Sequence, residues 1–423
     1  GGSRTIPTSG GETITTSGAR SYVIAGSNGE TGGAITITTP GAITTSGADS
    51  NGINAQNVGG ATTINVGTIT ATGGGLVTAI YAINTGGTID VTASGVSVVN
   101  GYGIRAVSGG AGSGAVNVTT TGAVSTLAYG IFAGSQYGDT TITAAAPITV
   151  TAVGAPAVIG IGTTGSVSIT TAGVTTNVSG GTGIIATTTT GSINVTDSGT
   201  LNTGGTGVYA YSSGGSVGVT ANNVIAGSYG IYAYGATGTT VTTNGDVTAV
   251  NTAIGAYAGG GTITVTTNGA VTSTGAASDA IFAAGPADIN ITTNGAVTTT
   301  GAGDSDGIQA YSYTGSSTIT ATNITAIDDG INTYGQSGVT ITSTGTITSG
   351  DEGIEAFTGA AANASITVNN VNATGSDNDA VRVTAGAGST ITVNGVVLGG
   401  ATSIDGAGID VQGGAPSTIN VNT

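Results

Sequence analysis

The chain has 423 residues, of which 81 are Gly, and it contains no Cys, Met or His. Without Cys it can form neither a disulfide framework nor a thiolate metal site. Only four residues are basic, all of them Arg, against 20 acidic residues, and the net charge is −16 at pH 7. Such a chain offers no electrostatic footprint for nucleic acid or for an anionic membrane.

A short motif recurs along the whole chain: a small or polar residue, then Ile or Val, then, two residues later, usually Ala. Examples are Gly52-Ile53-Asn54-Ala55 and Gly230-Ile231-Tyr232-Ala233. We call the aliphatic residue the anchor, and the anchors are Ile53, Ile80, Ile104, Ile131, Val158, Ile184, Val208, Ile231, Ile254, Ile281, Ile308, Ile331, Ile354, Val381 and Ile409. Successive anchors lie 23 to 28 residues apart. A period of this size indicates one supersecondary unit stacked many times.

Each repeat predicts short strands. Good helix formers such as Lys and Met are missing, and Leu and Arg are rare. Apolar and polar residues alternate over 262–267 before the turn pair Asn268-Gly269, and the same strand and turn recur over 240–245 and 289–295. The predicted fold is therefore all-β, a single parallel β-helix (β-solenoid) of about 15–16 coils with roughly three short strands per coil.

Stacked coils place residues of equal phase in columns. The anchor and the residue two positions later should face inward, and the residues one and three positions later should face outward. A leucine-rich repeat would need a Leu pattern that is absent here, and a β-propeller would need a longer period. Intrinsic disorder fits the Gly and Thr content, but regular aliphatic columns argue against it.

One periodicity runs through the whole chain, which predicts a single solenoid domain over residues 1–423. A chain that starts with Gly and has no Met favours a processed form or a fragment. No apolar run has the length of a membrane helix, and we expect no membrane insertion of this segment. The acidic, Lys-free and Thr-rich composition favours an extracellular or bacterial cell-surface location.

The segments 41–47 (GAITTSG) and 51–56 (NGINAQ) resemble the passenger repeats of bacterial autotransporters, the type V secretion proteins. The likeness extends along nearly the entire chain. No segment of it matches the C-terminal translocator barrel of that family, which we expect either to have been removed by cleavage or to lie beyond the printed sequence. The resemblance implies a β-helical fold, export through the outer membrane and use as an adhesin, surface fibre or scaffold.

Acidic residues gather in two columns towards the C-terminus. One column lies two residues before the anchor and the other three or four residues before it. Like charges about 5 Å apart repel, so the columns need compensation, and Ca²⁺ suits carboxylates and turn carbonyls. A solvated acidic stripe that keeps the solenoid soluble is the alternative. The candidate Ca²⁺ ligands are Asp279, Asp304, Asp306, Asp328, Asp329, Asp351, Glu352, Asp377, Asp379 and Asp405.

Aromatic residues occupy two outward columns. Three residues after the anchor lie Tyr211, Tyr234, Tyr257, Tyr311, Tyr334 and Phe357, which are candidate binding residues. One residue after the anchor lie Tyr81, Phe132, Tyr209, Tyr232 and Phe282. Exposed rings of this kind can bind glycans or another copy. Stabilisation of neighbouring strands is the simpler interpretation, which we favour.

We expect no enzymatic activity, because the acidic pairs recur in every coil and no His or Lys is present to act as a base. Both chain ends read as ordinary repeat, without an amphipathic cap, and an uncapped β-helix presents strand edges that another chain can extend. The predicted function is that of an extracellular structural protein that self-associates head-to-tail into filaments or a surface matrix. The alternative is a cell-surface adhesin that binds glycans or neighbouring cells through the aromatic columns.

Overall fold

The computed structural model describes residues 22–29, 32–177, 179–375, 378–400, 407–413 and 415–422, together with the backbone of residues 4–7 and 14–16. The chain is a parallel β-solenoid of about 15 turns with about three strands per coil, as the sequence predicts. The described residues include no helix, and hence none that could cross a membrane. The fold divides into two compact units, Gly1–Gly215 (unit 1) and Ser216–Thr423 (unit 2). The single domain over 1–423 stays a prediction.

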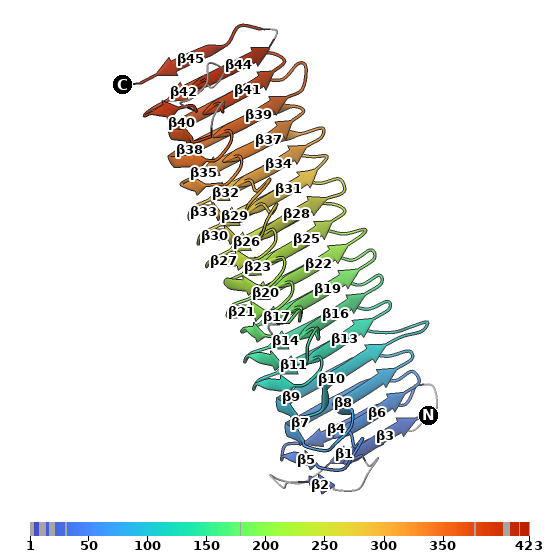
Figure 1. Cartoon of the computed structure of the whole chain (residues 1–423). Coiled ribbons are helices and arrows are strands. Elements are labelled where there is room, and N and C mark those ends of the chain that lie inside the picture. The colour runs from blue at the N-terminus through green and yellow to red at the C-terminus, as the bar shows by residue number, and fades with distance from the viewer. Residues whose placement is uncertain are drawn as a thin grey trace. The chain divides into compact units, whose positions relative to one another are not determined.

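In each unit one strand of every coil belongs to a sheet that carries the anchors, which we call the anchor sheet (Figure 1). Its strands in unit 1 are β3 (Ile24–Asn28), β6 (Ile53–Asn57), β8 (Val77–Asn84), β10 (Gly101–Ser108), β13 (Ile131–Ser135), β16 (Val158–Gly162), β19 (Ile184–Thr188) and β22 (Val208–Ser212). Its strands in unit 2 are β25 (Ile231–Gly235), β28 (Ile254–Ala258), β31 (Ile281–Gly285), β34 (Ile308–Ser312), β37 (Ile331–Gly335), β39 (Ile354–Thr358), β41 (Val381–Ala385) and β44 (Ile409–Gly413).

The remaining strands, usually two per coil, form the second sheet. In unit 1 these are β1 (Arg4–Pro7), β2 (Ile14–Thr16), β4 (Ile35–Thr39), β5 (Ile43–Thr45), β7 (Thr62–Ala71), β9 (Ile89–Val98), β11 (Val116–Thr120), β12 (Val124–Thr126), β14 (Thr140–Ala144), β15 (Ile148–Val150), β17 (Val167–Thr171), β18 (Val174–Thr175), β20 (Ile193–Asp197) and β21 (Thr200–Thr203). In unit 2 these are β23 (Val217–Ala221), β24 (Asn223–Ala226), β26 (Thr239–Thr243), β27 (Val247–Ala249), β29 (Ile263–Thr267), β30 (Val271–Ser273), β32 (Ile289–Thr293), β33 (Val297–Thr299), β35 (Ser316–Ala321), β36 (Ile324–Thr325), β38 (Gly338–Ser349), β40 (Ala364–Ala373), β42 (Ser389–Val393), β43 (Val397–Leu398) and β45 (Thr418–Val421). Each of β7, β9, β38 and β40 joins the two second-sheet segments of its coil in one long strand. Each long strand therefore pairs with both strands of a neighbouring coil or with another long strand.

The anchors pair with one another in parallel register from coil to coil. Ile53 pairs with Ile80 in unit 1, and Ile308 pairs with Ile331 in unit 2. Every anchor from Ile53 to Val381 is fully buried, with 0% of its surface exposed. Burial of such a side chain contributes about 1.5–3 kcal/mol. The inward anchor column is thus confirmed.

Several anchor-sheet strands end in a polar residue at the corner of the coil, as β13 ends in Ser135 and β34 in Ser312. Ser135 donates its hydroxyl to the Gly114 carbonyl at 2.8 Å, and Ser312 does the same to the Ala287 carbonyl at 2.8 Å. These bonds join a corner to the preceding coil and satisfy polar groups that are buried at the turn.

The position before the anchor is held by Gly or Ala because the next coil lies directly against it. A Cβ on Gly330 would lie 2.3 Å from Cγ2 of Ile347 and 2.4 Å from the Gly353 carbonyl oxygen. The small residue of the repeat motif therefore reflects close packing at the turn that leads into each anchor-sheet strand.

Candidate functional site

The five acids two residues before the anchor lie in the turns that lead into β31, β34, β37, β39 and β41. We call Asp279, Asp306, Asp329, Glu352 and Asp379 the acidic ladder. Asp306, Asp329 and Asp379 are only 3%, 6% and 8% exposed, and the other two are half-buried. A fully solvated stripe is therefore the wrong interpretation for the ladder.

Every aspartate of the ladder accepts the backbone N–H of the residue at the same phase in the next coil. Oδ1 of Asp279 accepts from the N–H of Asp306 at 3.1 Å, and Oδ1 of Asp306 accepts from Asp329 at 3.2 Å. Oδ1 of Asp329 in turn accepts from Glu352 at 3.0 Å. These bonds satisfy turn N–H groups, and a bond from an N–H group to a carboxylate is stronger than one to a neutral acceptor.

The same bond exists in unit 1 without a charge. Oδ1 of Asn51, which also lies two residues before its anchor, accepts the N–H of Thr78 at 2.8 Å. A neutral amide oxygen is thus sufficient to join successive coils at this position. The negative charge of the ladder in unit 2 is therefore not required for this hydrogen bond.

Polar residues one position after the anchor contact the second oxygen of the ladder carboxylates. Gln309 donates to Oδ2 of Asp306 at 3.0 Å, and Asn332 donates to Oδ2 of Asp329 at 3.1 Å. Asn332 also reaches Oε2 of Glu355 at 3.4 Å. Sequence reasoning missed Gln309, Asn332 and Glu355, although a run of polar residues where other coils carry aromatic ones was a usable signal.

The second acidic column lies beside the ladder. Asp304 is exposed, and Asp328 and Asp351 are half-buried. Asp377 and Asp405 lie outside the described residues. Carboxylate oxygens within 4.8 Å of one another come together in two groups, namely Asp306 with Asp328 and Asp329, and Asp329 with Asp351 and Glu352.

Burial raises the pKa of the ladder carboxyl groups, because desolvation disfavours the charged form. It raises the pKa of Asp279 to about 6. Burial, followed by the charge of the preceding ladder acid, raises the pKa of Asp306 to about 7 and that of Asp329 to about 9. Burial also raises the pKa values of Asp328 and Glu352, whose carboxyl groups additionally interact with Asp304 and Asp351 respectively.

One cation lies against the C-terminal part of this cluster. Nη1 of Arg382 lies 3.4 Å from Oε1 of Glu352 and 3.2 Å from Oε1 of Glu355. Burial raises the pKa of Glu355, and the Arg382 charge opposes that rise. Around Asp306 and Asp329, the described residues form no ion pair with a cationic side chain.

A cleft of about 230 Å³ opens at the N-terminal end of the cluster and is lined by Ala277, Asp279, Asp304, Asp306 and Gln309. Its oxygen-rich lining suits a hard cation such as Ca²⁺, which takes six to eight oxygen ligands in flexible geometry. The arrangement therefore offers two chemical outcomes at neutral pH, namely retention of protons or binding of a cation.

The six candidate aromatic residues all face outward, as predicted, and all are half-buried. In unit 2 the two predicted aromatic columns merge into one row. The ring of Tyr257 lies 5.1 Å from that of Tyr232 and 5.4 Å from that of Phe282, and Tyr311 continues the row at 6.3 Å from Phe282. Gly255 permits this, because a Cβ there would lie 3.1 Å from the Tyr257 ring.

Tyr334 donates its hydroxyl to the Gln336 side chain. Phe357 pairs with Tyr334 along the strand register, as Tyr234 pairs with Tyr257. Tyr211 lies in β22 of unit 1. The ring packing agrees with strand stabilisation, and a binding role for these residues stays a prediction.

Comparison of the chain with protein-family models, with curated proteins and with solved structures found no match. The fold defines the class of protein, which is a parallel β-solenoid of the β-helical repeat type.

Proposed function

We propose that this chain is a non-enzymatic structural solenoid of the cell surface or the extracellular space, similar in role to an autotransporter passenger. Copies of it add end to end into a filament or surface matrix. The observation that carries the proposal is the parallel register that repeats from coil to coil, in which Ile53 pairs with Ile80 and Ile308 pairs with Ile331.

The register of the repeat continues to the coil of β44 and β45. Ile419 and Val421 of β45 pair with Ile391 and Val393 of β42. Ile419 and Val421 are 49% and 59% exposed, whereas Ile391 and Val393 are 0% and 2% exposed. A coil that continues this register on the face of β45 would cover the side chains of Ile419 and Val421.

Another copy suits this face because the repeat has the same phase in every coil. A coil from a second chain meets the same row of hydrogen-bonding groups and the same inward columns that a coil of the same chain would meet. A contact between unlike ends of identical chains does not close and generates a filament.

Two pairs of substitutions on β45 test this proposal. Ile419→Asp with Val421→Asp places charges at the inward positions, and Thr418→Asp with Asn420→Asp places the same charges at the alternate positions of the same strand. We expect the first pair to abolish concentration-dependent assembly in sedimentation velocity and the second pair to preserve it. Identical behaviour of the two variants, or an unmodified chain that stays monomeric at all concentrations, would contradict end-to-end addition.

We further propose that the acidic ladder and the acids beside it bind Ca²⁺ at neutral pH. The support is the grouping of buried and half-buried carboxylates around Asp329, and within the described structure Asp306 and Asp329 form no ion pair with a cationic side chain. Ca²⁺ would compensate their repulsion and tie successive coils together.

The second candidate function is that of an adhesin for glycans or neighbouring cells. The row from Tyr232 to Tyr311 favours it, because half-buried rings in a continuous outward row present an extended apolar surface. Replacement of Tyr234, Tyr257 and Tyr311 by Ser distinguishes the two functions. Loss of cell-surface binding with intact assembly would favour the adhesin, and unchanged binding would contradict it.

A further inference from the structure

Unit 1 holds a cation between two aromatic rings on the outward face of its anchor sheet. The guanidinium carbon of Arg105 in β10 lies 5.4 Å from the ring centroid of Tyr81 in β8 and 5.7 Å from that of Phe132 in β13. Cation–π contacts on both sides hold the guanidinium in place. These contacts are not hydrogen bonds, so the N–H groups of the guanidinium remain available as donors to a ligand.

Arg105 has no acidic partner among the described residues, in a chain with a net charge of −16. This differs from Arg382 of unit 2, which contacts two glutamates. An Arg fork matches a carboxylate with two parallel hydrogen bonds, which makes an anionic group the natural ligand of Arg105. Because other charges are screened beyond about 8 Å at physiological salt, this local positive site persists on an acidic protein.

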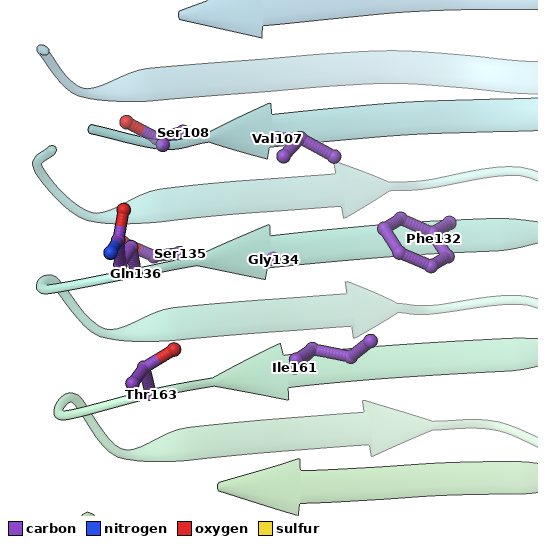
Figure 2. A pocket seen from close by; sticks show the side chains of 9 residues that line it. Val107, Ser108, Phe132, Gly134, Ser135, Gln136, Ile161 and Thr163 are labelled. Carbon is purple, nitrogen blue, oxygen red and sulfur yellow. The ribbon is translucent and has the colours of Figure 1, made fainter. Parts of the chain in front are cut away.

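A pocket lies next to this cation on the same face (Figure 2). It measures about 200 Å³ and is bordered by Val107 of β10, Phe132 of β13 and Ile161 of β16. Figure 2 shows Val107 and Ile161 on either side of Gly134, with Phe132 on the same strand as Gly134. The missing side chain of Gly134 forms the floor, since a Cβ there would meet only Ile161 and Phe132 at 3.5–3.8 Å.

Arg105 does not itself line the pocket but lies beside it, next to the lining residue Phe132, and polar side chains line the opposite end. Val107 pairs with Gly134 and Arg105 pairs with Phe132, so that the guanidinium belongs to the Phe132 end. Gln136 and Thr163 lie at the other end, in the turns after β13 and β16. The side-chain oxygen Oε1 of Gln136 accepts the backbone N–H of Gly110 at 2.8 Å. This bond fixes the side-chain amide of Gln136 at the rim of the pocket.

The size of the pocket limits the ligand to one ring. A cavity of about 150 Å³ holds a benzene molecule, so that 200 Å³ suits a single six-membered ring. The ring must present an apolar face to Val107, Phe132 and Ile161, a carboxylate to Arg105, and hydroxyl groups to the polar end. A sugar acid in its ring form combines these three features.

We propose that the pocket beside Arg105 binds one uronic acid residue of an acidic polysaccharide. The C–H face of the sugar ring packs on the Gly134 floor, and the C6 carboxylate pairs with the Arg105 guanidinium. The ring hydroxyls contact the side chains of Gln136 and Thr163. This site is independent of the acidic ladder and of the Tyr232–Tyr311 row, which belong to unit 2.

The test uses a trimer of galacturonic acid and its methyl ester, which has the same rings without the charges. Binding is measured by calorimetry in the presence of a chelator, so that Ca²⁺ cannot bridge the trimer to the acidic ladder. We expect the acid to bind at least tenfold more tightly than the ester. Equal affinity of the two, or no binding of the acid, would overturn the proposal.

Variants locate the site and control for charge. Arg105→Gln and Gly134→Val should each weaken binding of the trimer at least tenfold, the second by filling the pocket at an outward strand position. Arg382→Gln removes the same charge in unit 2 and should leave this affinity unchanged. Affinity that is unaffected by Arg105→Gln, or equal binding of a glutamate trimer, would overturn the assignment to uronic acids, and circular dichroism verifies that each variant is folded.

Discussion

The backbone N–H of Asp329 donates to Oδ1 of Asp306 at 3.2 Å, so that two buried carboxyl groups lie one coil apart. The hydrogen bond joins the coils, but the charge that accompanies it is costly in a desolvated turn. Unit 1 makes the equivalent bond with Asn51, which carries no charge. The ladder therefore behaves as an element that responds to protons or cations, in addition to joining coils.

The first prediction concerns pH. The pKa values of Asp306 and Asp329 in the folded chain are about 7 and about 9, against about 4 for an unfolded carboxyl group. Between these values the folded state binds more protons than the unfolded state, and stability must fall as pH rises. We expect the melting temperature of the chain in chelator to be highest near pH 4–5 and to fall steadily towards pH 9. A melting temperature that rises over this range would contradict the burial of the ladder.

The second prediction concerns removal of charge from the ladder. Asp306→Asn with Asp329→Asn retains an oxygen acceptor for the N–H groups of the next coil, as Asn51 shows in unit 1. At pH 8 each of these desolvated carboxyl groups must either carry a charge or retain a proton that the unfolded chain releases, so that the variant should be more stable than the unmodified chain at pH 8 in chelator. Each pKa unit corresponds to about 1.4 kcal/mol, and we expect a gain of about 1–3 kcal/mol. Denaturation at pH 8 and pH 5 measures it, and a variant that is less stable at pH 8 would contradict this account.

The third prediction concerns cations. If Ca²⁺ binds around Asp329, chelation at pH 8 should lower the melting temperature of the unmodified chain by several degrees, because a ligand bound only by the folded state stabilises it. The Asp306→Asn and Asp329→Asn double variant should lose this response. Differential scanning calorimetry with and without chelator measures both. An unmodified chain that shows no shift on chelation would exclude the proposed Ca²⁺ site.

The fourth prediction concerns the packing between coils. Val in place of Gly330 would drive its side chain into Ile347 and the Gly353 carbonyl, and we expect a loss of about 3 kcal/mol or more. Thr325→Val at an exposed strand position of the preceding coil is the control, with a change of about 0.5 kcal/mol or less. Urea denaturation compares the two, and equal stability would mean that the turn is not closely packed.

The architecture was predictable because the anchor column is a one-dimensional signal. Ile231, Ile254 and Ile281 each begin an anchor-sheet strand, and the strands that precede the Asn-Gly pairs end at Thr243, Thr267 and Thr293. One anchor was missed, since Ile24 of β3 pairs with Ile53 at the phase of an anchor. The 29-residue step between them lies just outside the range of the other steps.

The candidate sites were predictable only in part. The phase of the repeat places Asp306 and Asp329 in one column. It does not predict how deeply they are buried, because burial depends on how the turn folds against the next coil. The merged aromatic row depends on the absence of a side chain at Gly255, and the pocket beside Arg105 on its absence at Gly134. Such features arise from neighbouring coils of different sequence and have no repeating signal in the chain.

End-to-end addition of solenoids is tested most directly by electron microscopy and fibre diffraction of the concentrated chain, with Ca²⁺ and with a chelator. The account predicts filaments whose strong reflection near 4.8 Å lies along the filament axis, since every added coil continues the parallel strand spacing. Isolated particles at all concentrations, or a 4.8 Å reflection perpendicular to the filament axis, would contradict it.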